Sequence, residues 1–315
     1  MIIKVKNQHY IPRFYLKSFG ENNRVDVYDK CQKKFFPNAN VNNFASQNYF
    51  YDVNIDNNQI KKELDLMFKI YGHQYTTEEK EKIYKNPQLI EEYFARIEGD
   101  ISALFKEFES NNELIKDKNF LIKFYIFISS LAIRTAGYRD KLINLNEQLF
   151  NQAKKLGIDK IHDVDVNSDP KEVAKKIQLE QIMSLSHTFK NSKIFFNNYD
   201  FYVGINETGY PFIISDEVAF NVELFFKDIC FPITPKLAII MRVKDTNPKY
   251  YISKDTPNGN IIKLTHQGVF SYNILQYYQA KRYVFGSMKE IQRLQTLSKL
   301  LTNPQIRGKL RGTKN

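Results

Sequence analysis

The spacing of hydrophobic residues divides the chain into three regions. Before residue 58, short alternating runs predict a pair of strands over Val25–Asp29 and Lys33–Pro37 and a further strand over Tyr49–Tyr51. From about residue 58 to 190 the hydrophobic residues recur every three or four positions, which is typical of amphipathic helices. The alternating pattern then returns. The chain should therefore combine strands from both ends with a central helical block.

Three helices of this block are predicted from their capping sequences, in which a side-chain oxygen can accept a hydrogen bond from the first helical turn. These sequences are Thr76–Glu79, Asn86–Pro87 and Asp169–Pro170. The second helix should run through Phe108 and the third to about Phe189. Another helix should begin near Gln59.

The longest helical pattern extends from about Asp117 to Leu156. Between Phe120 and Ile133 it is apolar on nearly all sides, which predicts a helix buried at the centre of the fold. This apolar run is too short for a membrane span, which needs roughly 20 residues. Two more helices should follow late in the chain, one from about Thr265 to Phe285 and one that ends at Asn303.

Before these last two helices the sequence predicts an antiparallel meander of short strands separated by Asn, Gly and Pro turns. Its runs are Phe195–Phe196, Phe201–Ile205, Phe212–Ile214, Ile229–Phe231 and Leu237–Val243. The whole pattern favours an α+β fold, in which an antiparallel sheet built from amino- and carboxy-terminal segments has the central helical block packed against it. We expect a single integrated domain over residues 1–302 and a basic mobile tail over 303–315.

Composition adds a basic surplus. The 315 residues include 46 Lys and Arg against 35 Asp and Glu, which gives a formal net charge of +11. A nucleic-acid partner would explain this surplus, and so would a dispersed set of lysines that only solvates the surface. Cys31 and Cys230 each stand alone, so we expect buried small side chains in a reducing, cytoplasmic compartment. The first residues carry no signal-peptide pattern, and we expect no membrane partner.

Several reaction classes lack their sequence signatures. The chain has no phosphate-binding glycine loop, no dinucleotide glycine pattern, no Gly-x-Ser-x-Gly elbow and no His-Glu-x-x-His zinc helix. Nucleotide hydrolysis through a phosphate loop, hydride transfer, α/β-hydrolase chemistry and zinc-dependent proteolysis are therefore disfavoured. A restriction-type metal nuclease core is not visible either.

The opening segment His9–Leu16, followed by Phe19, resembles the start of a large bacterial family known only as a domain of unknown function. Further blocks match that family in order. They are Val25–Lys30, Asn43–Tyr51, Leu131–Thr135, Phe212–Asp216, Phe231–Pro235 and Asn273 with Ala280–Val284. One departure is that the proline expected two residues after Asp216 is replaced by Val218. The resemblance covers nearly the whole chain and implies no established activity.

His9 and Asp216 are two candidate catalytic residues. His9 lies among aromatic residues and cations, where an imidazole can act as a general acid or base; the alternative is a buried histidine that fixes the turn at Pro12. Asp216 follows the hydrophobic run Phe212–Ile214, so its carboxylate should project from the end of a strand. The alternative for Asp216 is a turn or a helix cap.

Arg134 and Glu98 are two more candidates. Arg134 ends the most buried helical segment, and a buried arginine needs a carboxylate, a carbonyl or a ligand phosphate as partner. Glu98 lies on a neighbouring predicted helix. The two residues either form a structural ion pair or orient a substrate phosphate and its attacking group. For Asn273, capping or packing is the favoured role.

Together these features lead us to expect a nucleic-acid phosphodiesterase of a bacterial toxin or defence type. Its predicted catalytic residues are His9, Glu98, Arg134 and Asp216, and its predicted nucleic-acid-binding residues are Arg13, Lys17 and Arg282. A divalent metal is possible, but no ligand set is identified. The alternatives are a non-catalytic module that binds nucleic acid or, through its last helix and basic tail, a protein, and a hydrolase of a small anionic substrate.

Overall fold

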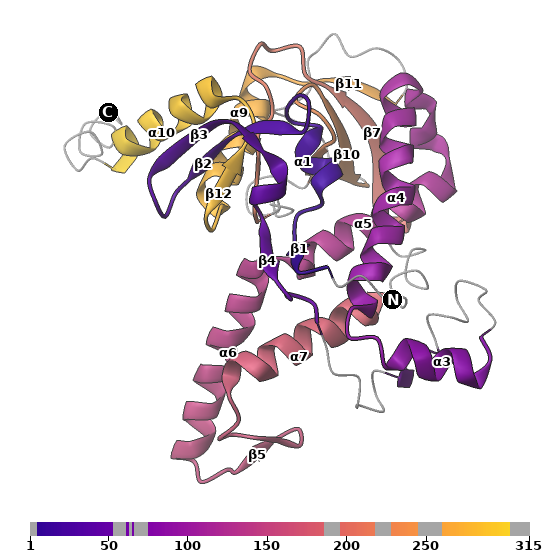
Figure 1. Cartoon of the computed structure of the whole chain (residues 1–315). Coiled ribbons are helices and arrows are strands. Elements are labelled where there is room, and N and C mark those ends of the chain that lie inside the picture. The colour runs from indigo at the N-terminus through magenta and orange to yellow at the C-terminus, as the bar shows by residue number, and fades with distance from the viewer. Residues whose placement is uncertain are drawn as a thin grey trace. The chain divides into compact units, whose positions relative to one another are not determined.

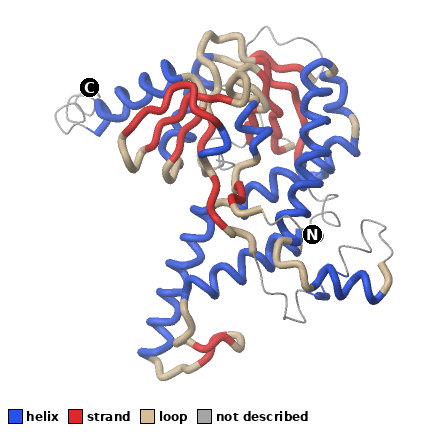
Figure 2. Tube along the Cα trace, viewed as in Figure 1, coloured by secondary structure: helices blue, strands red, loops and turns tan. Residues whose placement is uncertain are grey.

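The fold was analysed in a computed structural model, which describes residues 5–52, 61–62, 65, 75–185, 196–217, 228–244 and 260–302. The α+β class is confirmed, with antiparallel sheets that use amino- and carboxy-terminal strands and a central block of helices (Figure 2). The chain forms two compact units, each made of two separated segments. Unit one contains Met1–Pro12 and Ala45–Asn198, and unit two contains Arg13–Phe44 and Tyr199–Asn315. The expected single domain over 1–302 stays a prediction.

Unit one is mainly helical. Its described helices are α3 (Thr77–Tyr84), α4 (Leu89–Ser110), α5 (Lys118–Arg134), α6 (Ala136–Lys155) and α7 (Pro170–Met183), with a 3-10 turn η2 (Asn112–Lys116). Strand β1 (Asn7–His9) pairs antiparallel with β4 (Ser46–Asn48), and β5 (Lys160–Ile161) pairs with β6 (Val164–Asp165) beyond the end of α6 (Figure 1). The opening segment is thus attached to this unit by its own short ladder.

Helix α5 forms the core of unit one, as its apolar pattern predicted. Phe124, Phe127 and Leu131 are completely buried, and Phe105 of α4 contacts Phe124 and Phe127. The prediction of one helix from Asp117 to Leu156 was wrong, because extended Thr135 ends α5 and caps α6 by accepting a hydrogen bond from the Tyr138 N–H. Among the described helices, none is by itself long and apolar enough to cross a membrane. Helices α5 and α6, which are bent by 52° relative to each other, have sufficient length and apolar composition only when they are taken together.

Other local predictions in unit one had mixed outcomes. The capping box of Thr76 with Glu79 and the start at Asp169–Pro170 are confirmed. Helix α4 begins at Leu89 instead of after Asn86, because the Asn86 side chain accepts from the Gln88 N–H and holds a turn there. Tyr49–Tyr51 is a turn after β4, not a strand. The expected helix after Gln59 lies mostly outside the described residues, as do Phe195 and the stretch from 186 to Phe189. Phe196, which was expected in a strand with Phe195, is helical instead.

Unit two contains two four-stranded sheets. The first has the order β3-β2-β12-β8 and is antiparallel throughout; its strands are β2 (Arg24–Asp29), β3 (Lys34–Asn40), β8 (Ile214–Ser215) and β12 (Tyr283–Phe285). The second has the order β11-β7-β10-β9, made of β7 (Tyr199–Ile205), β9 (Asp228–Pro232), β10 (Leu237–Val243) and β11 (Ile261–Lys263). The helices are α1 (Arg13–Lys17), α9 (His266–Gln279) and α10 (Met288–Thr302), with the 3-10 turn η1 (Val41–Asn43).

Three features of this unit differ from the prediction. Cys31 is exposed and Cys230 is half-buried, whereas both were expected to be buried. The meander and the amino-terminal strands form separate sheets, because β8 pairs with β12 and not with β7 or β10. The helix expected to reach Phe285 ends at Gln279, and Tyr283–Phe285 instead forms a strand in which all three side chains are buried. Burial on both faces of this short aromatic and β-branched run outweighs the helical spacing. The predicted tail over 303–315 lies outside the described residues.

Helices α9 and α10 share one hydrophobic cluster with the first sheet. Its buried members are Tyr28, Ile213, Tyr277, Ala280, Val284, Ile291 and Leu294. The cluster joins β2, β12 and the segment before β8 to both helices, so it fixes the turns at the ends of these elements. Elsewhere in this unit, the Tyr15 hydroxyl donates to the Pro232 carbonyl at 2.8 Å, which links α1 to β9.

Candidate functional site

A cluster of cations lies at one end of the first sheet of unit two. There the last residues of β2 and β8 meet the first residues of β3 and β12, because Asp29 is opposite both Lys34 and Tyr283, and Ser215 is opposite Val284. The turns at this end and the first residue of β3 carry five cations, Lys30, Lys33, Lys34, Lys281 and Arg282. We call this region the basic sheet end. Three blocks that carry the family resemblance, Val25–Lys30, Phe212–Asp216 and Ala280–Val284, meet here.

Asp216 holds the turn that enters β12. Its side chain is 2% exposed, and it accepts hydrogen bonds from the Lys281 N–H and the Arg282 N–H, each at 2.9 Å. Its own N–H donates to the Tyr283 carbonyl at 3.0 Å. Burial raises the pKa of the Asp216 carboxyl to about 6, although these N–H groups favour the ionised form. The carboxylate therefore acts as an anchor for main-chain groups, which agrees with its alternative role as a cap.

Asp29 organises the neighbouring turn between β2 and β3. It is 1% exposed, and its Oδ1 accepts from the Cys31 N–H and the Gln32 N–H, both at 2.9 Å. Its Oδ2 pairs with Arg282 Nε at 2.9 Å. The Lys30 N–H donates to the Arg282 carbonyl at 2.7 Å. The two basic turns are thus joined by both main-chain and side-chain bonds.

Lys30 caps the end of α9. Its Nζ donates to the carbonyl oxygens of Tyr277 at 2.9 Å and Ala280 at 2.8 Å, and to that of Tyr278 at 3.3 Å. A cation is favourable at these carbonyls, which have no partner inside the helix. Burial lowers the pKa of the Lys30 ammonium. Lys30 therefore has a structural role, while Lys33 and Lys281 on the turns and Lys34 at the start of β3 are exposed.

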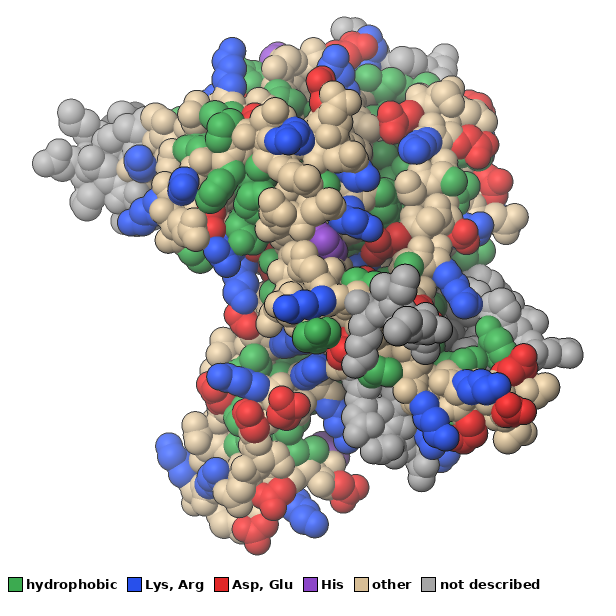
Figure 3. Space-filling view, in the orientation of Figure 1, with side chains coloured by type: hydrophobic (Ala, Val, Ile, Leu, Met, Phe, Trp, Pro, Cys, Tyr) green, Lys and Arg blue, Asp and Glu red, His purple; other side chains and the backbone are tan. Residues whose placement is uncertain are grey.

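This arrangement can attract anions. Two of the three carboxylates at the basic sheet end, Asp29 and Asp216, are buried and engaged by N–H donors, and the third, Glu217, is half-buried. Lys33, Lys34 and Lys281 are exposed residues. Over the visible face of the protein, Lys and Arg side chains are interspersed with Asp and Glu (Figure 3). The net charge of the protein therefore does not identify a binding site, which has to be located from the local arrangement of charged side chains.

The predicted residues His9, Glu98 and Arg134 meet in unit one. Arg134 is 1% exposed, and its Nη2 donates to the His9 carbonyl at 2.7 Å and to Glu98 Oε1 at 2.8 Å. Its Nε donates to the Tyr51 hydroxyl at 3.2 Å, and its guanidinium carbon lies 3.9 Å from the centre of the Phe94 ring. The predicted pairing of Arg134 with Glu98 is confirmed. These contacts favour a structural ion pair over a clamp for a substrate phosphate.

His9 meets Arg134 through its main-chain carbonyl, and its side chain is half-buried on β1. His9 belongs to unit one and Asp216 to unit two. The convergence of the His9 imidazole with Asp216 therefore stays a prediction. Among the described residues, no group of three His, Cys, Asp or Glu side chains is arranged to hold a metal ion. The possible divalent metal also stays a prediction.

The predicted nucleic-acid-binding residues do not form one group. Arg13 and Lys17 are exposed on α1, where Arg13 Nη1 donates to Asn42 Oδ1 at 3.4 Å. Asn42 lies two positions after the last residue of β3. Arg282 lies near the first residue of β3, because the next residue, Tyr283, is opposite Asp29, and Asp29 is opposite Lys34. Because β3 has seven residues, these ends are about 20 Å apart. Arg282 instead groups with Lys33, Lys34 and Lys281, which the predictions did not include although three lysines fall within residues 30–34.

Comparisons with known proteins identify a family but no activity. A family model described as a protein of unknown function, DUF4238, matches residues 7–290, which is most of the chain. Searches of curated proteins and of solved structures found no match.

Proposed function

The chain belongs to the DUF4238 family, and from that premise we propose that it is a non-catalytic module that binds the phosphate backbone of nucleic acid through its basic sheet end. One observation carries the proposal. Five cations lie at a sheet end where two of the three carboxylates, Asp29 and Asp216, are at most 2% exposed and are already bonded to main-chain N–H groups. The third carboxylate, Glu217, is half-buried. Cations that outnumber their carboxylates on a hydrogen-bonded scaffold are suited to contact several phosphates.

The same contacts support binding over cleavage. Asp216 accepts from two N–H groups, and Arg134 is engaged by Glu98, Tyr51 and the His9 carbonyl. A general base needs a carboxylate or imidazole that reaches the substrate, and a phosphate clamp needs a guanidinium with donors directed at it. The expected nuclease activity, with its toxin or defence setting, stays a prediction.

Binding is tested by fluorescence anisotropy with labelled 12-nucleotide RNA and DNA strands between 50 and 200 mM salt. The triple variant Lys33→Gln, Lys34→Gln, Lys281→Gln should bind more weakly than the wild type. Its slope of log affinity against log salt should be shallower by about 2, since each lost phosphate contact on a single strand accounts for roughly 0.7.

The matched control is Lys154→Gln, Lys155→Gln, Lys160→Gln, which removes the same charge from exposed positions of unit one. It should keep the wild-type slope. Equal losses of affinity in both triple variants would mean that net charge, and not the basic sheet end, determines binding. Absence of binding by the wild type would refute the proposed function.

The competing nuclease hypothesis is tested with the same strands, incubated with and without Mg²⁺ or Mn²⁺. We expect intact strands in every case. Cleavage by the wild type that disappears in His9→Ala, with binding retained, would overturn the non-catalytic proposal and support His9 as an acid or base.

A further inference from the structure

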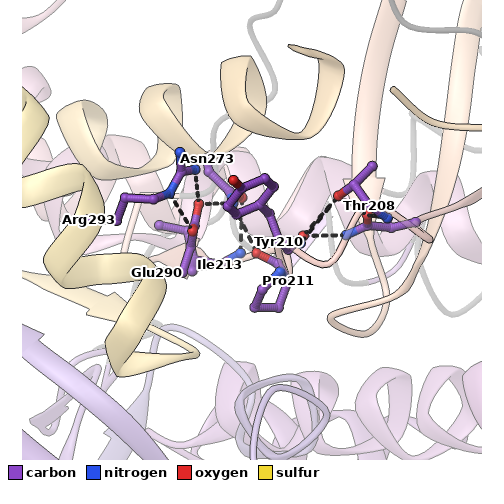
Figure 4. A network of polar contacts seen from close by, with 8 residues as sticks. Thr208, Tyr210, Pro211, Ile213, Asn273, Glu290 and Arg293 are labelled. Atoms are coloured by element: carbon purple, nitrogen blue, oxygen red, sulfur yellow. Dashed lines mark hydrogen bonds and ion pairs between the residues drawn. The ribbon is translucent and has the colours of Figure 1, made fainter. Parts of the chain in front are cut away.

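An exposed tyrosine projects from the segment between β7 and β8. Tyr210 is 37% exposed. Its N–H donates to Thr208 Oγ1 at 3.3 Å, and its carbonyl accepts from Asn206 Nδ2 at 2.8 Å (Figure 4). Asn206 is itself buried and also donates to the Pro235 carbonyl at 3.1 Å. The main chain is therefore fixed at the residue that carries the exposed ring.

The residues after Tyr210 are fixed from α9. Asn273 is completely buried; its Nδ2 donates to the Pro211 carbonyl at 2.9 Å, and its Oδ1 accepts from the Ile213 N–H at 3.1 Å. This confirms the packing role expected for Asn273. Tyr210 thus lies between two hydrogen-bonded anchors, so its position costs little further ordering when a ligand binds.

A cation lies over the ring of Tyr210. The guanidinium carbon of Arg293 is 4.3 Å from the centre of that ring and 5.1 Å from the centre of the Phe270 ring. Glu290 holds Arg293 in place through two hydrogen bonds of 2.6 and 2.8 Å, and also accepts from Asn273 at 2.9 Å (Figure 4). Glu290 is 3% exposed, whereas the Arg293 side chain is 31% exposed.

His266 completes the group. Its ring contacts Tyr210 edge to face, with ring centres 5.4 Å apart, and its side chain is exposed at the start of α9. Two exposed aromatic rings thus lie beside a half-buried guanidinium. The need of buried Glu290 for a counter-ion explains Arg293. It does not explain why Tyr210, held at two anchors, and His266 remain exposed beside it.

We propose that Tyr210, Arg293 and His266 form a stacking site for a base of single-stranded nucleic acid. This inference rests on the proposed function and gives it a preference for single strands. Aromatic rings and arginine planes are the groups on which unpaired bases stack, and duplex bases are unavailable because they stack on each other. The cation over Tyr210 also favours a ligand that carries phosphate over a cationic one.

One strand can reach both this stacking site and the basic sheet end. His266 is the first residue of α9, and Lys281 follows its last residue by two positions. A helix of 14 residues is about 21 Å long. This length corresponds to about six nucleotides at a helical spacing of 3.4 Å. A 12-nucleotide probe is therefore long enough to occupy both.

The test compares three labelled 12-mers, oligoadenylate DNA, an abasic deoxyribose-phosphate strand and a duplex, by fluorescence anisotropy. The wild type should bind oligoadenylate roughly fivefold to 100-fold more tightly than the abasic strand, as expected for one stacked base. Tyr210→Ala should lose most of that difference and leave abasic binding unchanged. Tyr210→Phe should preserve it, because the ring and not the hydroxyl stacks.

The control is Tyr49→Asn, which removes another exposed tyrosine, in unit one, at a position with φ of 53° that Asn tolerates. It should bind all three probes like the wild type, and thermal melting should show that each variant is folded. If the wild type binds oligoadenylate and the abasic strand equally, the stacking site is refuted while the proposed function stands. If no probe binds, the proposed function fails. If Tyr210→Ala weakens binding of both strands equally, Tyr210 contacts the backbone and the stacking proposal is also refuted.

Discussion

The two units contain arginine–carboxylate pairs with opposite burial. In unit one Arg134 is 1% exposed and its partner Glu98 is 23% exposed. In unit two the Arg282 side chain is 43% exposed and the side chain of its partner Asp29 is 2% exposed. When the cation is buried, its donors are used by the protein. When the carboxylate is buried, the cation remains at the surface, where it can meet an anionic ligand.

This difference also explains why sequence position alone did not separate the two arginines. Both were candidates for phosphate contact, Arg134 as a clamp and Arg282 as a nucleic-acid-binding residue. The Glu290–Arg293 pair resembles Asp29–Arg282 in that the carboxylate is buried and the arginine is more exposed, with side-chain exposed fractions of 3% and 31%. Arg282 and Arg293, the arginines of these two pairs, belong to unit two. We therefore place the proposed nucleic-acid contacts there.

The largest expected effect is loss of stability on replacement of Arg134. Arg134→Met would leave Glu98 without its partner and remove donors from the His9 carbonyl and the Tyr51 hydroxyl. We expect a loss of about 3–5 kcal/mol in the free energy of unfolding, measured by urea denaturation. The matched variant Arg282→Met should lose less, about 1–2 kcal/mol, because the buried Asp29 carboxylate loses one donor but keeps the Cys31 and Gln32 N–H groups. Similar losses in both would contradict the distinction between the pairs.

The next effect is a pH dependence that arises at Asp216. Its pKa is raised in the folded protein from an ordinary 3.8 to about 6, mainly by burial. The folded state therefore binds the proton more tightly than the unfolded state. The stability associated with this proton is fully present below pH 3.8 and is lost as the pH rises through about 6. The loss is on the order of 3 kcal/mol.

The measurement is the unfolding free energy of the wild type and of Asp216→Asn between pH 4 and 8. Asn does not titrate, so the wild type should become less stable relative to the variant as the pH rises. A constant difference would show that Asp216 has an ordinary pKa and is not desolvated. The other groups that interact with Asp216, which include Lys30, Glu217 and Tyr283, remain in both proteins and should not produce this difference.

The sequence predicts those parts of the fold that depend on local spacing and capping. Strand β10 was predicted with its observed bounds, Leu237–Val243, because alternation and flanking turns agree there. The capping box at Thr76 was also recognised. Tyr283–Phe285 was not, because its residues continue a helical spacing and only pairing with β2 and β8 makes the strand favourable. That information lies more than 60 residues away in the chain.

The candidate site was predictable only in part, for a related reason. Arg282 and Asp216 were singled out as residue types, but their adjacency depends on the register of β8 with β12. The sequence also indicated that Arg134 would need Glu98, and the pair forms. It did not show which member of each pair faces solvent. That property depends on the depth of the packed helix or sheet end, which hydrophobic periodicity does not specify.

A smaller effect should separate the structural cation of the basic sheet end from its exposed neighbours. Lys30→Met removes donors from three carbonyls at the end of α9. We expect a loss of about 1–2 kcal/mol in the free energy of unfolding by urea denaturation. The matched variant Lys33→Met should change stability by less than about 0.5 kcal/mol, because Lys33 is exposed on the turn. Equal stability of the two variants would mean that Lys30 does not cap the helix.

The smallest effect is expected from single charge removals that compare the two predicted binding surfaces of unit two. Lys33→Gln at the basic sheet end should lower the affinity for a single-stranded 12-mer a few-fold and reduce the salt slope by about 0.7. Lys17→Gln, on α1 near the other end of β3, should leave both values unchanged. Thermal melting should show that neither variant is destabilised, since both lysines are exposed. If Lys17→Gln gave the larger change, the opening segment with Arg13 and Lys17 would be the binding surface. An exposed cation next to a buried carboxylate would then not be the feature that binds the nucleic acid.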